Sequence, residues 1–141
     1  MSEEAGLAVN LPAPLAEMRE AFVAYERALM ENDVALRDLL FWRSPLALRY
    51  GVAEKLYGWD AIPAFRAGRS HTGLARSLRN TVTTTFGTVS ATANTEFVRE
   101  GSSRIGRQSQ CWIRFPAAEV GEACHGWRIV AAHVSLLAPP G

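Results

Sequence analysis

The sequence is short of lysine and of net charge. Lys55 is the only lysine, arginine supplies the remaining formal positive charge, and the net charge is +1. A balance this even gives no general reason to expect binding to nucleic acid or to an anionic membrane. The arginine bias has two explanations that the sequence leaves open. It reflects the base composition of the genome, or it reflects several arginines whose planar forks bind carboxylates.

Cysteine and long apolar runs are also scarce. Cys111 and Cys124 are the only cysteines and form no CxxC pair, which excludes a disulfide framework and favours free thiols in a reducing compartment. The N-terminal stretch MSEEAGLAVNLPAP lacks the basic and apolar regions of a signal peptide. No run approaches the roughly 18 apolar residues of a membrane span. We therefore expect a cytoplasmic protein with no membrane contact.

The sequence lacks the common motifs for metals, phosphates and activated serines. His71, His125 and His133 show neither a helical i, i+4 spacing nor an HxH pair on a strand. The glycine-rich patterns GxGxxG and GxxxxGK and the GxSxG elbow are all absent. We expect no metal site and no cofactor.

The 141 residues fit one domain. We expect a loose tail over residues 1–12 and a single domain over residues 13–141. Apolar residues at steps of three and four predict a long first helix that opens at Pro14 and turns Tyr25 toward the core. Asn32 or Asp33 is placed to cap a short second helix that runs through Leu40.

A third helix is expected between Asp60, its cap, and Thr72-Gly73. Its inward stripe contains two arginines, an unusual feature of an apolar stripe: Ile62, Phe65, Arg66 and Arg69.

The second half of the chain changes to a period of two, which is typical of strands. Four long strands are expected over residues 78–86, 89–97, 104–115 and 127–137, with a short strand after Pro45 and a loop over residues 116–126. Helices followed by consecutive strands indicate an α+β fold, with helices on one face of a strongly bent antiparallel sheet. Such a sheet leaves an opening at one end, a common ligand site.

Several polar side chains in these elements have two interpretations each. Arg49 alternates with Leu48 and Tyr50, so it faces either solvent or a pocket. On the strand over residues 106–115, Gln110 or its neighbour Ser109 presents hydrogen bonds to a small ligand, or the polar face is solvated; which face looks inward stays open. Tyr25 has either a satisfied hydroxyl or a proton to donate. His133 is a core or interface histidine, or a catalytic one.

Five short stretches resemble one family: F-x-x-Y-x-x-A-L at residues 22–29, LFW at 40–42, RxG at 49–51, GRQSQ at 106–110 and WRIVAAHVS at 127–135. The chain resembles the NTF2-like (SnoaL-like) superfamily and, within it, the AtzH-like proteins, a group that includes proteins associated with oxalurate catabolism. The resemblance implies a cone, in which three N-terminal helices pack in a curled antiparallel sheet. It also implies a homodimer, or a higher homo-oligomer, through the outer face of the sheet. The loop over residues 116–126 is longer than the resemblance suggests.

The resemblance further implies a cofactor-independent decarboxylase that converts 1,3-dicarboxyurea to allophanate in the breakdown of cyanuric acid from s-triazines. Tyr25 and Arg49 correspond to the family's tyrosine and arginine. Arg49 and Arg69 would each hold one carboxylate of this small anionic ureide, Tyr25 would protonate the nitrogen, and Trp42 would pack against the flat ureide.

Two other functions fit the same resemblance. One is a non-catalytic protein that binds a ureide or partners an amidase-signature hydrolase in oxalurate catabolism. The other is a different enzyme on the same cone, such as an oxalurate-pathway hydrolase or isomerase.

Overall fold

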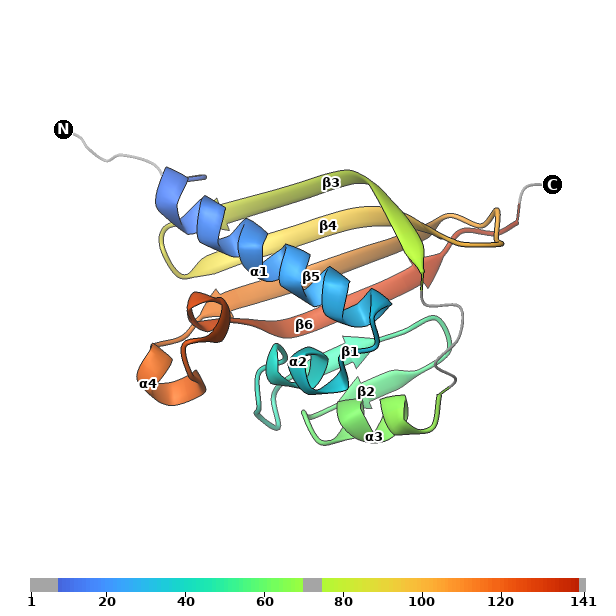
Figure 1. The fold of residues 1–141 in the computed structure, drawn as a ribbon, viewed down its shortest axis with the longest axis horizontal. Coiled ribbons are helices and arrows are strands. Elements are labelled where there is room, and N and C mark those ends of the chain that lie inside the picture. Colours follow the sequence, from blue (N-terminus) through green and yellow to red (C-terminus); the bar gives the residue numbers. More distant parts are fainter. Residues whose placement is uncertain (1–7, 70–74, 140–141) are drawn as a thin grey trace.

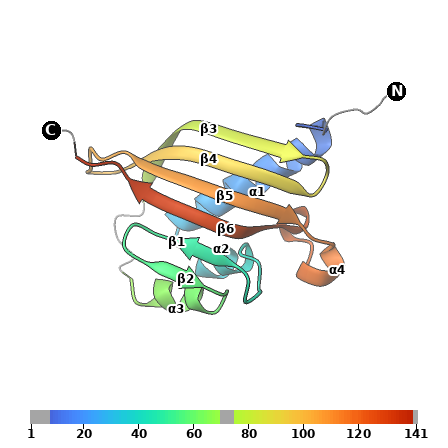
Figure 2. The same ribbon diagram turned by 180° about the vertical axis from the view of Figure 1, so that it is seen from behind.

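The computed structural model describes residues 8–69 and 75–139. One six-stranded sheet forms the body, with the strand order β2-β1-β6-β5-β4-β3. The strands are β1 (Leu48–Tyr50), β2 (Lys55–Tyr57), β3 (Arg76–Phe86), β4 (Ser90–Arg99), β5 (Gly106–Arg114) and β6 (Trp127–Leu136). The helices α1 (Pro12–Met30), α2 (Val34–Leu39) and α3 (Ala61–Ala67) gather on one face of this sheet (Figure 1). From behind, none of the helices in the described residues covers the opposite face of the sheet (Figure 2).

The sheet is mixed, so the expectation of a wholly antiparallel sheet was wrong at one pair of strands. β1 runs parallel to β6, with Arg49 opposite Ala132, whereas the other neighbouring strands are antiparallel. A parallel pair needs a long crossover between its strands. Here α3 and strands β2 to β5 lie between β1 and β6 in the chain and provide it.

The first three helices lie where the apolar periodicity predicts them. α1 begins at Pro12, two residues before the expected start, and buries Tyr25 on its inner stripe. Asp33 caps α2, because its Oδ1 accepts a hydrogen bond from the Leu36 backbone N–H at 3.2 Å. α3 ends at Ala67 with Gly68 as its C-cap. Its expected end at Thr72-Gly73 lies outside the described residues.

The segment expected to be a loop carries a fourth α-helix, α4 (Ala117–Val120), and a 3-10 turn over residues 123–126. The expected number of three helices was therefore too small for the described part of the chain. Arg128 holds this segment in place: one guanidinium nitrogen donates to the Ala123 carbonyl and the other to the Val120 carbonyl, both at 2.8 Å.

The part of the expected tail that the structure describes, residues 8–11, contacts the sheet. The Asn10 backbone N–H donates to the Thr85 carbonyl at 3.0 Å, and the Asn10 Oδ1 accepts from the Thr85 N–H at 2.9 Å. Residues 8–10 are thus bonded to the end of β3 and to Gly87, while the domain boundary expected after residue 12 stays a prediction.

The core lies between α1 and the inner face of the sheet. Its largest fully buried side chains include Met18, Phe41, Trp112 and Trp127. Along β5 the burial alternates, with Gln108, Gln110 and Trp112 buried. The register therefore settles the question left open by the sequence: this face of β5 looks inward.

Candidate functional site

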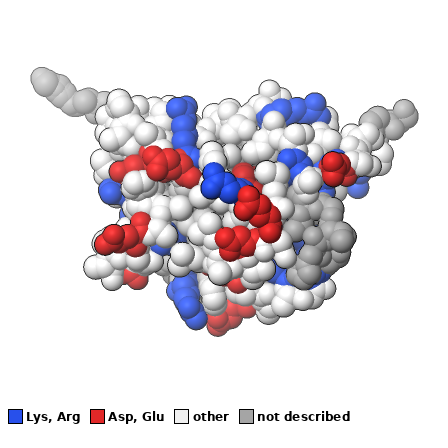
Figure 3. Space-filling model, viewed as in Figure 1, with Lys and Arg blue, Asp and Glu red and all other residues white. Residues whose placement is uncertain are grey.

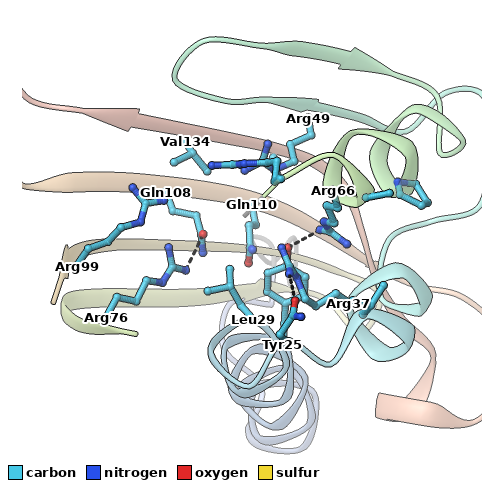
Figure 4. Close-up of a pocket in the computed structure, with 16 residues that line it drawn as sticks. Tyr25, Leu29, Arg37, Arg49, Arg66, Arg76, Arg99, Gln108, Gln110 and Val134 are labelled. Atoms are coloured by element: carbon cyan, nitrogen blue, oxygen red, sulfur yellow. Dashed lines mark hydrogen bonds between the residues drawn. The ribbon is translucent and has the colours of Figure 1, made fainter. Parts of the chain in front are cut away.

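A cavity of about 350 Å³ lies between the three N-terminal helices and the inner face of the sheet. Its lining is dominated by arginines from five different elements (Figure 4). They are Arg37 on α2, Arg49 on β1, Arg66 on α3, Arg69 just after α3, Arg76 on β3 and Arg99 on β4. The lining also includes Tyr25 from α1 and Gln108 and Gln110 from β5.

The floor of the cavity is a row of residues across three neighbouring strands. Arg49 on β1 is opposite Ala132 on β6, and Ala132 is opposite Gln110 on β5. Neighbouring strands lie about 4.8 Å apart, so the Arg49 and Gln110 backbones are separated by roughly twice that spacing. Because Ala132 is small, the space above it stays open between the two polar side chains.

Three of the lining arginines are paired with carboxylates. The ion pairs are Arg49–Glu54 at 2.6 Å, Arg66–Asp38 at 2.8 Å and Arg76–Glu26 at 2.7 Å. Within residues 8–69 and 75–139, the other three lining arginines have no carboxylate partner: Arg37, Arg69 and Arg99. The cavity thus holds more positive than negative charge.

Burial, and then neighbouring guanidiniums, lower the pKa of two of these unpaired arginines. Burial lowers the pKa of Arg37 and the nearby Arg66 lowers it further, Tyr25 acts in the opposite direction, and Arg49 adds a smaller lowering. Burial also lowers the pKa of Arg99, and Arg76, Arg69 and Arg49 add to this effect. The Nε of Arg37 is buried and has no hydrogen-bond partner in the described structure. An anion in the cavity would relieve this repulsion and accept from such donors.

Tyr25 is fixed with its hydroxyl oxygen already accepting a hydrogen bond. Its side chain is buried, and the Arg66 Nη2 donates to the Tyr25 oxygen at 2.9 Å. Its ring packs edge-on against Phe41 and Trp112, with centroids 6.1 and 6.4 Å away. A guanidinium only donates, so the tyrosine keeps its own hydroxyl hydrogen for another acceptor. Tyr25 therefore has a proton available to a group in the cavity.

The two glutamines on β5 differ in what they leave free. The Gln108 Oε1 accepts from Arg76 at 2.9 Å and its Nε2 donates to Glu26 at 3.1 Å, so both ends of this amide are bonded. The Gln110 Oε1 accepts from the Trp112 Nε1 at 2.9 Å. No described residue accepts a hydrogen bond from the Gln110 Nε2.

The structure brings together four of the six residues that the sequence picks out. Tyr25, Arg49, Arg69 and Gln110 all line the cavity. The Arg49 side chain is 17% exposed, which rules out the fully solvated interpretation. Their roles toward a substrate stay predictions.

Trp42 and Ser109 do not line this cavity, so their expected contacts with a ligand stay predictions that its geometry does not support. Backbone hydrogen bonds join residues 40–42 to Ile129 in extended form, which turns Phe41 inward and Trp42 away. Trp42 instead stacks on Phe115, with ring centroids 5.4 Å apart. Ser109 is exposed on the outer face of β5.

His133 also lies outside the cavity. It is exposed and opposite Ser109 in the register of β5 and β6, and its ring packs edge-on against Tyr50 at 5.7 Å. The catalytic interpretation of this histidine has no support in the geometry.

Six polar residues of the described lining escaped the sequence analysis as site residues: Asn32, Arg37, Arg66, Arg76, Arg99 and Gln108. The sequence pattern of two of them indicated an inward position. Arg66 lies on the expected inward stripe of the third helix, and Gln108 shares a strand face with Gln110. The other arginines show nothing unusual locally, because each comes from a different element.

Acidic and basic side chains are interspersed on the helix side of the molecule (Figure 3). Among the described residues, no group of three or more histidine, cysteine or carboxylate side chains is placed to hold a metal ion. No helix in that part of the chain is long and apolar enough to cross a membrane.

Solved structures with this arrangement define the class as an NTF2-like, or cystatin-like, fold. A ketosteroid isomerase-like protein from Erwinia carotovora atroseptica matches with a TM-score of 0.66 at 13% identity, over 92% of this chain and 100% of that chain. An NTF2-like superfamily protein from Salmonella enterica matches with a TM-score of 0.67 at 24% identity, over 91% of this chain and 94% of the other. At these identities the likeness shows the fold alone.

The family model described as AtzH-like matches residues 7–140, and the chain belongs to this family. A protein of unknown function from the DUF3225 family of Pectobacterium atrosepticum is 50% identical, with a TM-score of 0.86 over 94% of this chain and 100% of that one. A cystatin-like fold protein from Burkholderia xenovorans is 47% identical, with a TM-score of 0.85 over 96% and 100%. A search among proteins of curated function gave no match.

Proposed function

We propose that the cavity binds a small dianionic ureide and catalyses loss of CO2 from its N-carboxylate, the conversion of 1,3-dicarboxyurea to allophanate in cyanuric acid breakdown. One observation carries this proposal. Unbalanced guanidiniums converge with a tyrosine whose hydroxyl hydrogen is free to be donated, in one cavity of about 350 Å³. That volume is at the small end of ligand pockets, which span roughly 300–1,000 Å³.

The charge distribution supports a ligand with two negative groups. Arg37 lies beside Arg66, and Arg99 lies near Arg76 and Arg69, while Arg49 is close enough to lower the pKa of both Arg37 and Arg99. Fixed positive charge is therefore present at both ends of the cavity and between them. Guanidinium–carboxylate contacts are the strong, often bidentate hydrogen bonds that such a diacid would make.

The reaction places modest demands on the protein. The bond between nitrogen and the carboxylate carbon breaks, CO2 leaves, and the electron pair stays on a nitrogen conjugated to a carbonyl. Tyr25 donates its proton to that nitrogen and becomes a phenolate, which the hydrogen bond from Arg66 stabilises. A proton from solvent restores the tyrosine. Closely placed general acids typically contribute about 10²–10⁴-fold to the rate.

The type of cation in the cavity also supports an N-carboxylate. The described lining has arginines and no lysine, and Lys55 is exposed on β2. A lysine amine would be needed to form a Schiff base with a carbonyl substrate. Loss of CO2 from nitrogen needs no such adduct, since the neighbouring carbonyl already accepts the electrons.

The test is the rate of CO2 release from 1,3-dicarboxyurea generated in situ. We expect Tyr25→Phe to lower kcat by about 10²–10⁴-fold, because the ring packing stays and the proton is lost. Tyr57→Phe, a change at an exposed tyrosine, is the matched control and should leave the rate unchanged. A wild-type rate equal to the uncatalysed rate would refute the decarboxylase.

The surplus of positive charge equally fits a protein that binds a ureide without converting it, alone or as the partner of an amidase. Calorimetric binding of a dicarboxylate together with an absence of CO2 release would favour that alternative.

A further inference from the structure

We propose that Gln110, oriented by Trp112, recognises a neutral carbonyl between the two carboxylates of the ligand. The cavity would therefore select diacids that carry a central carbonyl over diacids that lack it. This inference rests on the proposed function, because it assumes the same dianionic ligand.

The orientation of the Gln110 amide follows from its partner. An indole N–H donates and does not accept, so the atom that faces the Trp112 Nε1 at 2.9 Å is the amide oxygen. The Nε2 with its two hydrogens is consequently turned away from the indole. Gln110 is 3% exposed and lines the cavity, and no described residue accepts from its Nε2.

Gln108 shows that this freedom is specific to one of the two glutamines. Its amide oxygen and nitrogen are both engaged, by Arg76 and Glu26, so it has little left to offer a ligand. The cavity thus presents one neutral amide donor among guanidiniums. A neutral N–H donor matches a carbonyl oxygen, whereas the guanidiniums already match the carboxylates.

Gln110 also lies at the right place along the cavity. Successive residues on one face of a strand are about 7 Å apart. Gln108, bonded to Arg76, is the neighbour on one side, and Trp112, packed against Tyr25, is the neighbour on the other. In Figure 4 Gln110 accordingly appears between the Arg76–Arg99 group and the Tyr25–Arg66 group. A ligand that reaches both groups has its middle at Gln110.

The same contact would assist the chemistry. When CO2 leaves the nitrogen, negative charge spreads onto the central carbonyl oxygen, and the Gln110 N–H donates to that oxygen. Removal of one such preorganised donor typically lowers kcat by about 10²–10³-fold. Gln110 is then a binding and catalytic residue, and Trp112 is its positioning residue.

The experiment measures two dissociation constants by calorimetry, with freshly dissolved 3-oxoglutarate and glutarate as probes. Both are five-carbon diacids, and only the first carries a central carbonyl. We expect the wild type to bind 3-oxoglutarate about tenfold more tightly, the effect of one buried hydrogen bond. Gln110→Met, similar in volume, should bind both diacids equally and keep the wild-type affinity for glutarate. Trp112→Phe should lose most of the preference with unchanged glutarate affinity.

Each outcome decides the matter. Equal affinities in the wild type, a preference retained in Gln110→Met, or no binding of either diacid would overturn the inference. If one variant fails to fold, as judged by circular dichroism, the other together with the wild-type ratio still gives the answer. The ratio of the two dissociation constants is measured without turnover. A clear preference for 3-oxoglutarate without CO2 release would therefore refute the proposed decarboxylase activity and leave the role of Gln110 in binding intact. CO2 release without a preference for 3-oxoglutarate would refute the role of Gln110 and leave the decarboxylase activity intact.

Discussion

Replacement of Glu26 by glutamine tests the electrostatic balance of the cavity most directly. Glu26 and Arg76 form an ion pair whose side chains are 7% and 2% exposed, and the Arg76 Nε and Nη2 both donate to the carboxylate, at 3.1 and 2.7 Å. Gln108 donates to the same carboxylate at 3.1 Å. Glu26→Gln keeps the shape and removes the charge, so Arg76 stays buried with no counterion.

The cost follows from that burial. Removal of one partner from a buried ion pair typically destabilises a protein by about 3–5 kcal/mol. In a chain of this size each kcal/mol lowers the melting temperature by about 2–4 °C, so we expect a drop of about 10 °C. The loss exceeds the intrinsic strength of the pair, because an uncompensated guanidinium is left behind.

Urea denaturation and a thermal melt measure the effect, with Glu96→Gln as the matched control. Glu96 pairs with Arg79 at 3.8 Å, and their side chains are 37% and 52% exposed, so this loss should stay within about 0.5 kcal/mol. Because Arg76 lines the cavity, glutarate should stabilise Glu26→Gln more than the wild type. A loss below about 1 kcal/mol for Glu26→Gln would refute the reasoning.

Three further predictions follow from other parts of the structure. Ala132→Leu should fill the floor between Arg49 and Gln110 and lower the affinity for glutarate at least tenfold in calorimetry; unchanged binding would mean that the ligand lies elsewhere. The hydrogen bond between the Tyr50 and Tyr57 hydroxyls raises the pKa of Tyr50 above its usual value of 10, so Tyr57→Phe should lower it in an ultraviolet titration. The stabilisation from this bond is present below about pH 10 and lost as the pH rises through the raised pKa. Gly126→Ala should cost about 1–3 kcal/mol in urea denaturation, because Gly126 has a φ of +87° and a Cβ would collide with the Phe115 carbonyl; a neutral effect would contradict this.

Local periodicity predicted most of the fold because it reports which side of an element is buried. The stripe through Tyr25 predicted α1, the cap at Asp33 predicted α2, and the period of two predicted the four long strands. The parallel pairing of β1 with β6 and the three-residue strand β2 were missed. Both depend on contacts between segments far apart in the chain, which no local pattern records.

The same reason limited the prediction of the site. The helical stripe placed Tyr25 inward, whereas alternation left Arg49 between solvent and a pocket, and only the family resemblance marked it as a site residue. Arg37 and Arg99 lie on separate elements and meet only in the folded cavity. Trp42 was misplaced because the chain after α2 is extended, so consecutive side chains point to opposite sides.

β1, β2 and α3 form a unit that carries Arg49 and Arg66 and ends just before Arg69. The strands of this unit join the four long strands of the sheet only through the β1–β6 ladder. That ladder covers Leu48–Tyr50, whereas β5 and β6 pair over nearly their full lengths. Backbone amides in β1 and β2 should therefore exchange with deuterium sooner than those in β5. The cavity has one wall anchored in a long ladder and one wall that opens more easily. A ligand that bridges Arg49 and Gln110 would join the two walls and slow that exchange.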